Sequence, residues 1–132
     1  MPRTFPLAIA LACAAAAVGE ATPATRCEVA GTWTGTADDE TGGHWTFTLE
    51  LAAQGDKLSG VFHWKGALTG DEFVRGSVDC AAGTMALDAY KVTGDLALGA
   101  YRVGLGADGT TFRGKWTCIT PCIEGSIAGK KR

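Results

Sequence analysis

This chain of 132 residues lacks an excess of either charge, since it has 12 Lys and Arg and 14 Asp and Glu, which give a formal net charge of −2. A nucleic-acid-binding domain usually carries a basic stripe, so this balance argues against that class of partner. Helical periodicity is also lacking after residue 24, because no apolar stripe recurs every three or four residues. We therefore expect an all-β protein that binds no nucleic acid.

The motifs of common enzyme classes are missing as well. No phosphate-binding Gly loop, nucleophile elbow or zinc helix motif occurs. The chain contains two histidines, His44 and His63, and strand alternation places both on an outer face, away from each other and without partners. The sequence thus predicts a non-enzymatic protein without a cofactor.

Long hydrophobic runs are limited to Leu7–Val18, which follows Arg3 and precedes several small residues. This is the pattern of a secretory signal peptide, and the run is too short for a membrane-spanning helix of ~20 residues. A lipoprotein signal acylated at Cys13 is the rival interpretation, disfavoured by the very short apolar run before that residue. We expect a signal peptide over residues 1–24 and a secreted or periplasmic/cell-envelope location.

What the chain does have is strand periodicity, clearest in residues 44–51. Trp45, Phe47, Leu49 and Leu51 take every second place there, and polar side chains take the others. The same pattern recurs in short segments separated by Gly-rich turns, and we attribute the 19 glycines to such turns and to strand bends. The expected strands cover residues 31–38, 44–51, 58–66, 73–80, 84–92, 98–105, 111–118 and 122–130.

Eight strands joined by short links are the count of a small, closed, antiparallel up-and-down barrel. A β-sandwich is the alternative, and residues 25–132 are expected to form a single β-barrel domain. The apolar side chains of the second and third strands must face the same side of the sheet. This requires a register in which Leu49 lies opposite Phe62 and Phe47 lies opposite Trp64. The strand at 84–92 is the least clear, because neither of its faces is cleanly apolar.

With Cys13 set aside, four of the five cysteines remain, an even number that indicates two disulfides in an exported chain. In an up-and-down barrel, Cys27 and Cys80 lie at one end, while Cys118 and Cys122 flank the last turn at the other. The sequence therefore predicts the bonds Cys27–Cys80 and Cys118–Cys122. A zinc site is disfavoured, because the spacing is wrong and neither histidine is near.

The same topology sorts the charges between the two ends of the barrel. Basic residues at the N-terminal end are Arg26, Lys57, Lys130, Lys131 and Arg132. Acidic residues are expected in loops at the opposite end, namely Asp38, Asp39, Glu40, Asp71, Glu72 and Asp95. Their oxygens suit a hard cation such as Ca²⁺, but solvated loops are the simpler interpretation, and these residues are only weak candidates for a metal site.

Aromatic side chains gather toward the acidic end and form the candidate ligand site: Trp45, Phe47, Trp64, Tyr101 and Trp116. Rings at the mouth of a barrel could stack a flat or apolar ligand, and acidic loops above them would favour a cationic group. The alternative is that the rings simply fill the core. Trp33 is expected near the other end.

Gly31-Thr32-Trp33 on a first strand, followed by about eight short antiparallel strands, resembles the calycin-type barrels, which include lipocalins and the avidin/streptavidin group. The opening from Cys27 to Thr34 is also similar to avidins. The resemblance implies a small ligand inside the barrel. It does not extend to biotin, because among the later residues only Trp116 could wall such a site and the closing signature of the family is absent.

These observations predict an exported, non-enzymatic binding module that holds a small apolar or aromatic ligand in a barrel lined by tryptophans. A secreted interaction or inhibitor protein that acts through its loops around a filled core is the alternative. A metal-dependent enzyme built on the acidic loops is a third class. The expected partner is accordingly a small apolar ligand or an unknown protein.

Overall fold

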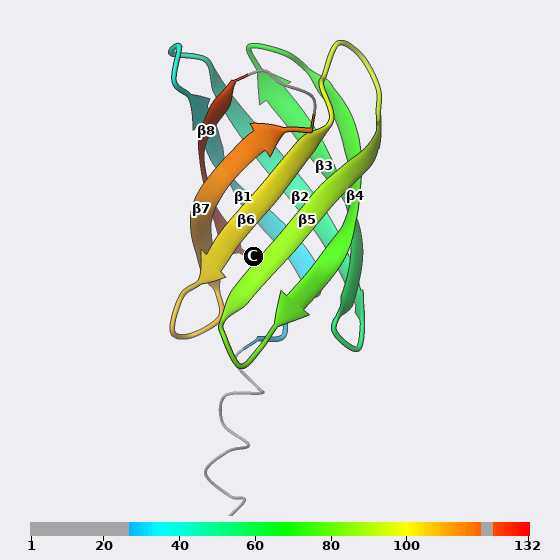
Figure 1. Ribbon diagram of the computed structural model, residues 1–132, viewed down its shortest axis with the longest axis vertical. Coiled ribbons are helices and arrows are strands. Elements are labelled where there is room, and N and C mark those ends of the chain that lie inside the picture. The colour runs from blue at the N-terminus through cyan, green and yellow to red at the C-terminus, as the bar shows by residue number, and fades with distance from the viewer. Residues whose placement is uncertain (1–26, 120–122) are drawn as a thin grey trace, which may run out of the picture.

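The computed structural model describes residues 27–119 and 123–132 (Figure 1). They form eight antiparallel strands in which each strand pairs with the next and β8 pairs with β1. The strands are β1 (Gly31–Asp39), β2 (His44–Gln54), β3 (Lys57–Gly66), β4 (Gly70–Asp79), β5 (Thr84–Val92), β6 (Gly99–Leu105), β7 (Thr111–Cys118) and β8 (Glu124–Lys131). The predicted up-and-down barrel is confirmed, and the sandwich alternative is wrong.

The expected signal peptide and the alternative acylation of Cys13 both lie outside the described residues and stay predictions, as does the position of Arg26. Within the described part of the chain, no helix has the length and apolar character that a membrane span requires.

The register between β2 and β3 agrees with the pattern of their apolar residues. Leu49 pairs with Phe62 and Phe47 pairs with Trp64. All four side chains are buried, because both strands turn their apolar residues toward the barrel interior. The predicted register is confirmed.

The weak alternation of β5 has a structural cause. Met85, Leu87 and Ala89 point inward and are buried, which is a regular strand pattern. The pairing with β4 then shifts, so that Val74 faces Ala89 while Phe73 faces Lys91, and Tyr90 is the extra residue of a β-bulge. Because of the bulge, the consecutive residues Tyr90 and Lys91 are both exposed. This interrupts the alternation of inward and outward residues, so the inward face of β5 is hard to recognise in the sequence.

Strand direction gives the barrel two different ends. We call the end with Cys27 and the turns after β2, β4 and β6 the closed end, at the bottom of Figure 1. The end with the loops after β1, β3, β5 and β7 is the mouth. The predicted Cys27–Cys80 disulfide is confirmed at the closed end, with the two Cα atoms 5.5 Å apart. Cys118 is also disulfide-bonded, but Cys122 lies outside the described residues, so their pairing stays a prediction.

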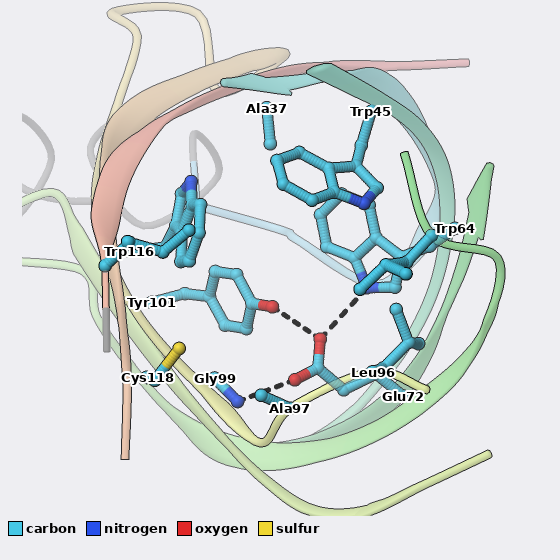
Figure 2. A pocket seen from close by; sticks show the side chains of 12 residues that line it. Ala37, Trp45, Trp64, Glu72, Leu96, Ala97, Gly99, Tyr101, Trp116 and Cys118 are labelled. Atoms are coloured by element: carbon cyan, nitrogen blue, oxygen red, sulfur yellow. Dashed lines mark hydrogen bonds between the residues drawn. The ribbon is translucent and has the colours of Figure 1, made fainter. Parts of the chain in front are cut away.

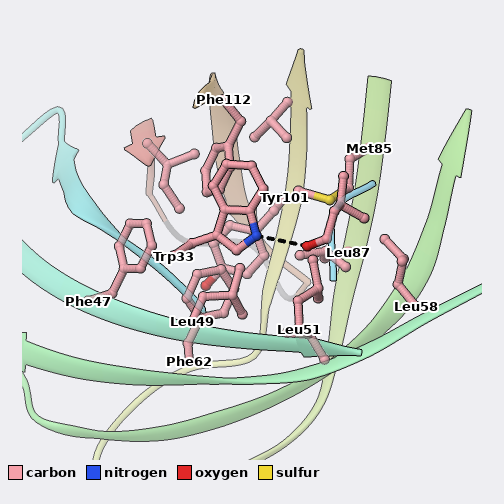
Figure 3. Close-up of a cluster of buried hydrophobic side chains, with 14 of the residues drawn as sticks. Trp33, Phe47, Leu49, Leu51, Leu58, Phe62, Met85, Leu87, Tyr101 and Phe112 are labelled. Atoms are coloured by element: carbon pink, nitrogen blue, oxygen red, sulfur yellow. Dashed lines mark hydrogen bonds between the residues drawn. The ribbon is translucent and has the colours of Figure 1, made fainter. Parts of the chain in front are cut away.

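The core of the closed end is built around Trp33, which is 0% exposed. Its indole Nε1 donates a hydrogen bond to the Val29 carbonyl oxygen at 2.9 Å (Figure 3). Its ring lies 5.1 Å from that of Phe112, measured between centroids. Leu49, directly across the β1–β2 ladder from Trp33, is likewise 0% exposed. The closed half of the barrel is therefore filled by side chains.

Two glycines lie inside strands, where they leave space for these rings, and do not serve a turn. A Cβ atom at Gly129 would lie 2.6 Å from the ring of Phe112, and one at Gly35 would lie 2.0 Å from the carbonyl oxygen of Ala128 and 2.7 Å from the ring of Phe47. Both glycines sit in the middle of strands. Our attribution of glycine to turns and bends is therefore incomplete, because a narrow barrel can hold large rings only opposite residues without side chains.

A candidate ligand cavity at the mouth of the barrel

A cavity of about 110 Å³ lies at the mouth, above the filled half of the barrel. Four strands each contribute one aromatic side chain to its wall (Figure 2): Trp45 from β2, Trp64 from β3, Tyr101 from β6 and Trp116 from β7. An apolar cavity of about 150 Å³ can hold a benzene molecule. The cavity is therefore close in size to one small ring.

Trp45 and Trp116 form the outer wall. Their rings meet edge to face, with centroids 5.9 Å apart and an interplanar angle of 85°. The indole Nε1 of Trp116 donates to the backbone oxygen of Asp38 at 3.2 Å, which ties the ring to β1. Both tryptophans are only partly buried, so their rings remain open to a molecule that enters the mouth.

Trp64 and Tyr101 form the floor of the cavity. Each ring packs on Phe62 with a centroid distance of 4.8 Å. Phe47 lies beneath them, 5.2 Å from the ring of Trp64 and 6.1 Å from that of Phe112. Of the five aromatic candidates, four thus line the cavity, while Phe47 belongs to the core that supports its floor.

Glu72 lies inside the barrel, which differs from its predicted position in a loop. We expected Asp71 and Glu72 in a loop, but β4 begins at Gly70 and contains both. Strand alternation turns Asp71 outward and Glu72 inward, in line with Val74 and Val78. Glu72 is 1% exposed and borders the cavity. The two-residue spacing of Glu72 from Val74 could have indicated that it faces inward, but a carboxylate is rarely expected on a buried face.

Three donors hold the carboxylate of Glu72. Its Oε1 accepts from the indole Nε1 of Trp64 at 2.9 Å and from the hydroxyl of Tyr101, and its Oε2 accepts from the backbone N–H of Gly99 at 2.7 Å (Figure 2). Gly99 permits this arrangement, since a Cβ atom there would lie 2.7 Å from the Tyr101 hydroxyl oxygen. Sequence reasoning missed this network entirely, because its members come from three strands.

The network changes the acidity of both titratable members. Burial raises the pKa of Glu72, and the three hydrogen bonds to its charged form partly oppose that shift. Burial, together with the neighbouring Glu72 charge, raises the pKa of Tyr101 well above its ordinary value. Tyr101 is therefore a neutral hydrogen-bond donor at physiological pH.

The remaining acidic candidates are only partly in loops. Asp38 and Asp39 belong to β1, so their predicted place in a loop is wrong, while Glu40 and Asp95 lie in loops as expected. Asp39 Oδ1 accepts from the hydroxyl of Thr41 at 2.7 Å and from the backbone N–H of Gly43 at 2.8 Å, and these hydrogen bonds lower the pKa of Asp39. Among residues 27–119 and 123–132, no group of three or more His, Cys, Asp or Glu side chains is arranged to hold a metal ion.

The expectation of two unpartnered histidines is wrong. On the outer surface, His44 Nδ1 lies 2.6 Å from Asp38 Oδ1. His63 Nδ1 lies 2.8 Å from Asp71 Oδ1, and its Nε2 lies 3.2 Å from Glu50 Oε2. These partners sit on neighbouring strands, so a pattern within one strand could not reveal them. The hydrogen bond with Asp71 is the main cause that raises the pKa of His63.

Comparison with known proteins gives the fold but no family. No protein-family model and no curated protein matches the chain. A redesigned β-barrel, mFAP1, bound to DFHBI, is similar with a TM-score of 0.62 and 14% identity over 79% of this chain and 94% of that one. EF1p2_mFAP2b bound to DFHBI gives 0.61 and 13% over 79% and 93%.

The chain shares their β-barrel fold. At this level of identity the likeness extends to nothing finer. The closed barrel that the calycin resemblance implied is present, whereas membership of the lipocalin or avidin groups stays a prediction.

Proposed function

We propose that the protein is an exported, non-enzymatic binding module that takes one apolar or aromatic ring into the cavity at its mouth. The observation that carries the proposal is a cavity of about 110 Å³ walled by three tryptophans and a tyrosine in a barrel whose other half is filled. Ligand sites in proteins are typically apolar concavities with few, well-placed polar groups. Glu72 is such a group.

Two further observations support this function. Both similar barrels are complexes with DFHBI, so the fold is compatible with binding a ligand. The Cys27–Cys80 disulfide fits an oxidising compartment, in keeping with the expected signal peptide.

Tryptophan fluorescence tests the proposal, because three of the four tryptophans of the chain line the cavity. Titration with toluene and with benzyl alcohol should give a saturable change. Ala37→Leu should abolish it, since Ala37 borders the cavity and is 2% exposed, so a larger side chain would occupy the space. Ala52→Leu is the matched control, because Ala52 is exposed on the outer face of β2.

The proposal is wrong if no ring compound gives saturable binding, or if Ala37→Leu binds as tightly as the unmodified protein. Thermal unfolding of both variants checks that the comparison is made on folded protein.

An interaction protein that acts through its loops is a second candidate. Leu68 and Ile119 are 40% and 51% exposed, and both lie in loops at the mouth, where they would contact a protein partner. Ile119→Ser separates the two functions, because Leu68 is among the residues that line the cavity and Ile119 is not. Loss of the protein's biological activity with ring binding unchanged favours the loops, whereas an activity that Ile119→Ser leaves intact favours the cavity.

A further inference from the structure

Glu72 is a buried carboxylate without a cation beside it. The ion pairs formed between described residues are His44–Asp38, His63–Glu50, His63–Asp71 and Arg102–Asp88, and none of them includes Glu72. Taking a carboxylate out of water is costly unless a counter-charge or hydrogen bonds compensate. Among the described residues only hydrogen bonds compensate for this burial, and no side-chain cation pairs with the carboxylate.

The carboxylate also keeps one acceptor position. An ionised carboxylate can accept about four hydrogen bonds. Oε1 receives two, from Trp64 and Tyr101, and Oε2 receives one, from Gly99. Glu72 borders the cavity, so this remaining position is the one left for a donor carried by a ligand.

Resting on the function proposed above, we infer that the ligand is a small cyclic or aromatic amine whose protonated nitrogen binds Oε2 of Glu72 while its ring fills the aromatic cavity. A charge-assisted hydrogen bond of this kind is shorter and stronger than a neutral one. The rings of Trp45 and Trp116 add faces on which a cation is favourable.

No other charged side chain of the described residues competes for this carboxylate. Tyr101 contacts Glu72 as a neutral donor. Asp71, its neighbour on β4, points outward to His63. Lys91 precedes Val92, the residue of β5 that pairs with Glu72, but it lies over the ring of Phe73, with Nζ 5.2 Å from the centroid, and is exposed. Among the described residues, no cationic side chain therefore neutralises the interior carboxylate, which leaves that role to a ligand.

Matched single-ring probes test the ligand class. Benzylamine is cationic at neutral pH, benzyl alcohol is a neutral analogue of the same size, and benzoate is an anion. Calorimetric titration at pH 7 should show benzylamine binding at least about tenfold more tightly than benzyl alcohol, with benzoate not bound. Lowering the pH toward 4 should weaken benzylamine, because protonation of Glu72 removes the charge, and should leave benzyl alcohol unchanged.

Glu72→Gln should bring benzylamine down to the affinity of benzyl alcohol. Glu40→Gln, which removes the same charge from an exposed loop of the mouth, should change benzylamine affinity less than about twofold, because exposed charges are screened. The pH titration of the unmodified protein gives an answer even if Glu72→Gln does not fold.

The outcomes separate this inference from the function on which it rests. Equal affinities for benzylamine and benzyl alcohol, without pH dependence, would overturn the amine assignment and leave the ring-binding function in place; Glu72 would then serve only to join β3, β4 and β6. If neither benzylamine nor benzyl alcohol binds, both the amine assignment and the ring-binding function are wrong.

Discussion

The closed end and the mouth of this barrel are built from the same kind of residue with opposite results. At the closed end, Trp33 is 0% exposed and its indole N–H is satisfied by the Val29 carbonyl. At the mouth, Trp64 donates instead to the buried carboxylate of Glu72, and Trp45 and Trp116 stay partly open. An aromatic side chain therefore packs into the core where the barrel is filled, and lines a cavity where the barrel is not filled.

The difference also lies in how polar groups are satisfied. The closed end satisfies its buried tryptophan with a backbone carbonyl and adds the Cys27–Cys80 disulfide. The mouth places a titratable acid inside, where burial raises its pKa. Stability and pH sensitivity are thus expected to reside in different halves of the molecule.

The largest expected effect is that of a charge placed in the filled half. Leu49→Asp should prevent folding or cost more than about 4 kcal/mol in the free energy of unfolding, because Leu49 is 0% exposed and the new carboxylate would have no partner. Ile123→Asp places the same charge at the cavity wall, on a half-buried residue that water can reach, and should cost about 1 kcal/mol. Urea unfolding followed by circular dichroism measures both; a native-like Leu49→Asp protein would contradict the register.

Removing the Cys27–Cys80 bond tests the covalent part of the closed end. The bond closes a loop with a sequence separation of 53, for which the chain-entropy model assigns about 4 kcal/mol. Cys27→Ala combined with Cys80→Ala should therefore lower the melting temperature strongly, as measured by calorimetry. Ring binding at the mouth should persist below the new melting temperature. Loss of binding in the folded variant would show that the two ends are coupled.

Glu72→Ala tests the polar network of the mouth. The variant leaves the donors on Trp64, Gly99 and Tyr101 without their acceptor. We expect the free energy of unfolding to fall by about 2–3 kcal/mol. Three fully buried donors would cost more, but here water can enter the cavity and replace part of the lost bonding. Glu40→Ala, on the exposed loop, should change stability by less than about 0.5 kcal/mol. Chemical denaturation compares the two variants. Equal stabilities would mean that the network contributes nothing to the fold.

The pH dependence of stability should also report on Glu72. Its folded-state pKa is raised above the ordinary value of 4.5, so the folded protein holds this proton more tightly than the unfolded chain. Stability should therefore fall as the pH rises from 4.5 through the folded-state pKa, and then level off. Glu72→Gln should remove this step in urea unfolding measured at a series of pH values. A step of unchanged size in the variant would assign it to another group.

The smallest effect is expected on the outer surface, at His63. Its folded-state pKa is raised above 6.5, so its stabilising contribution is complete below pH 6.5 and is lost as the pH rises through the folded-state pKa. The side chain is 43% exposed, so this contribution should stay below about 1 kcal/mol. His63→Gln should remove this step, whereas His44→Gln should retain it; NMR titration of the imidazole protons provides the direct measurement.

The sequence by itself determined the architecture, because strand alternation is a local property. An inward face is recognisable within eight residues, from Trp45, Phe47, Leu49 and Leu51. Because the turns are short, consecutive strands lie side by side and pair. The up-and-down order then brings Cys27 next to Cys80, so that disulfide followed from topology. Four of the five aromatic candidates also reached the cavity wall for this reason, since each position on a strand has a defined height in the barrel.

Only the tertiary structure decided what the interior contains. Whether the rings fill the barrel or leave a cavity depends on the summed volume of side chains from all eight strands, including glycines such as Gly35 and Gly129 that yield space to a ring on another strand. Glu72 became part of the interior through donors on β3 and β6 that are 8 and 27 or more residues away in sequence. Its burial is stabilised by these contacts across the barrel, and no pattern within a single strand records them.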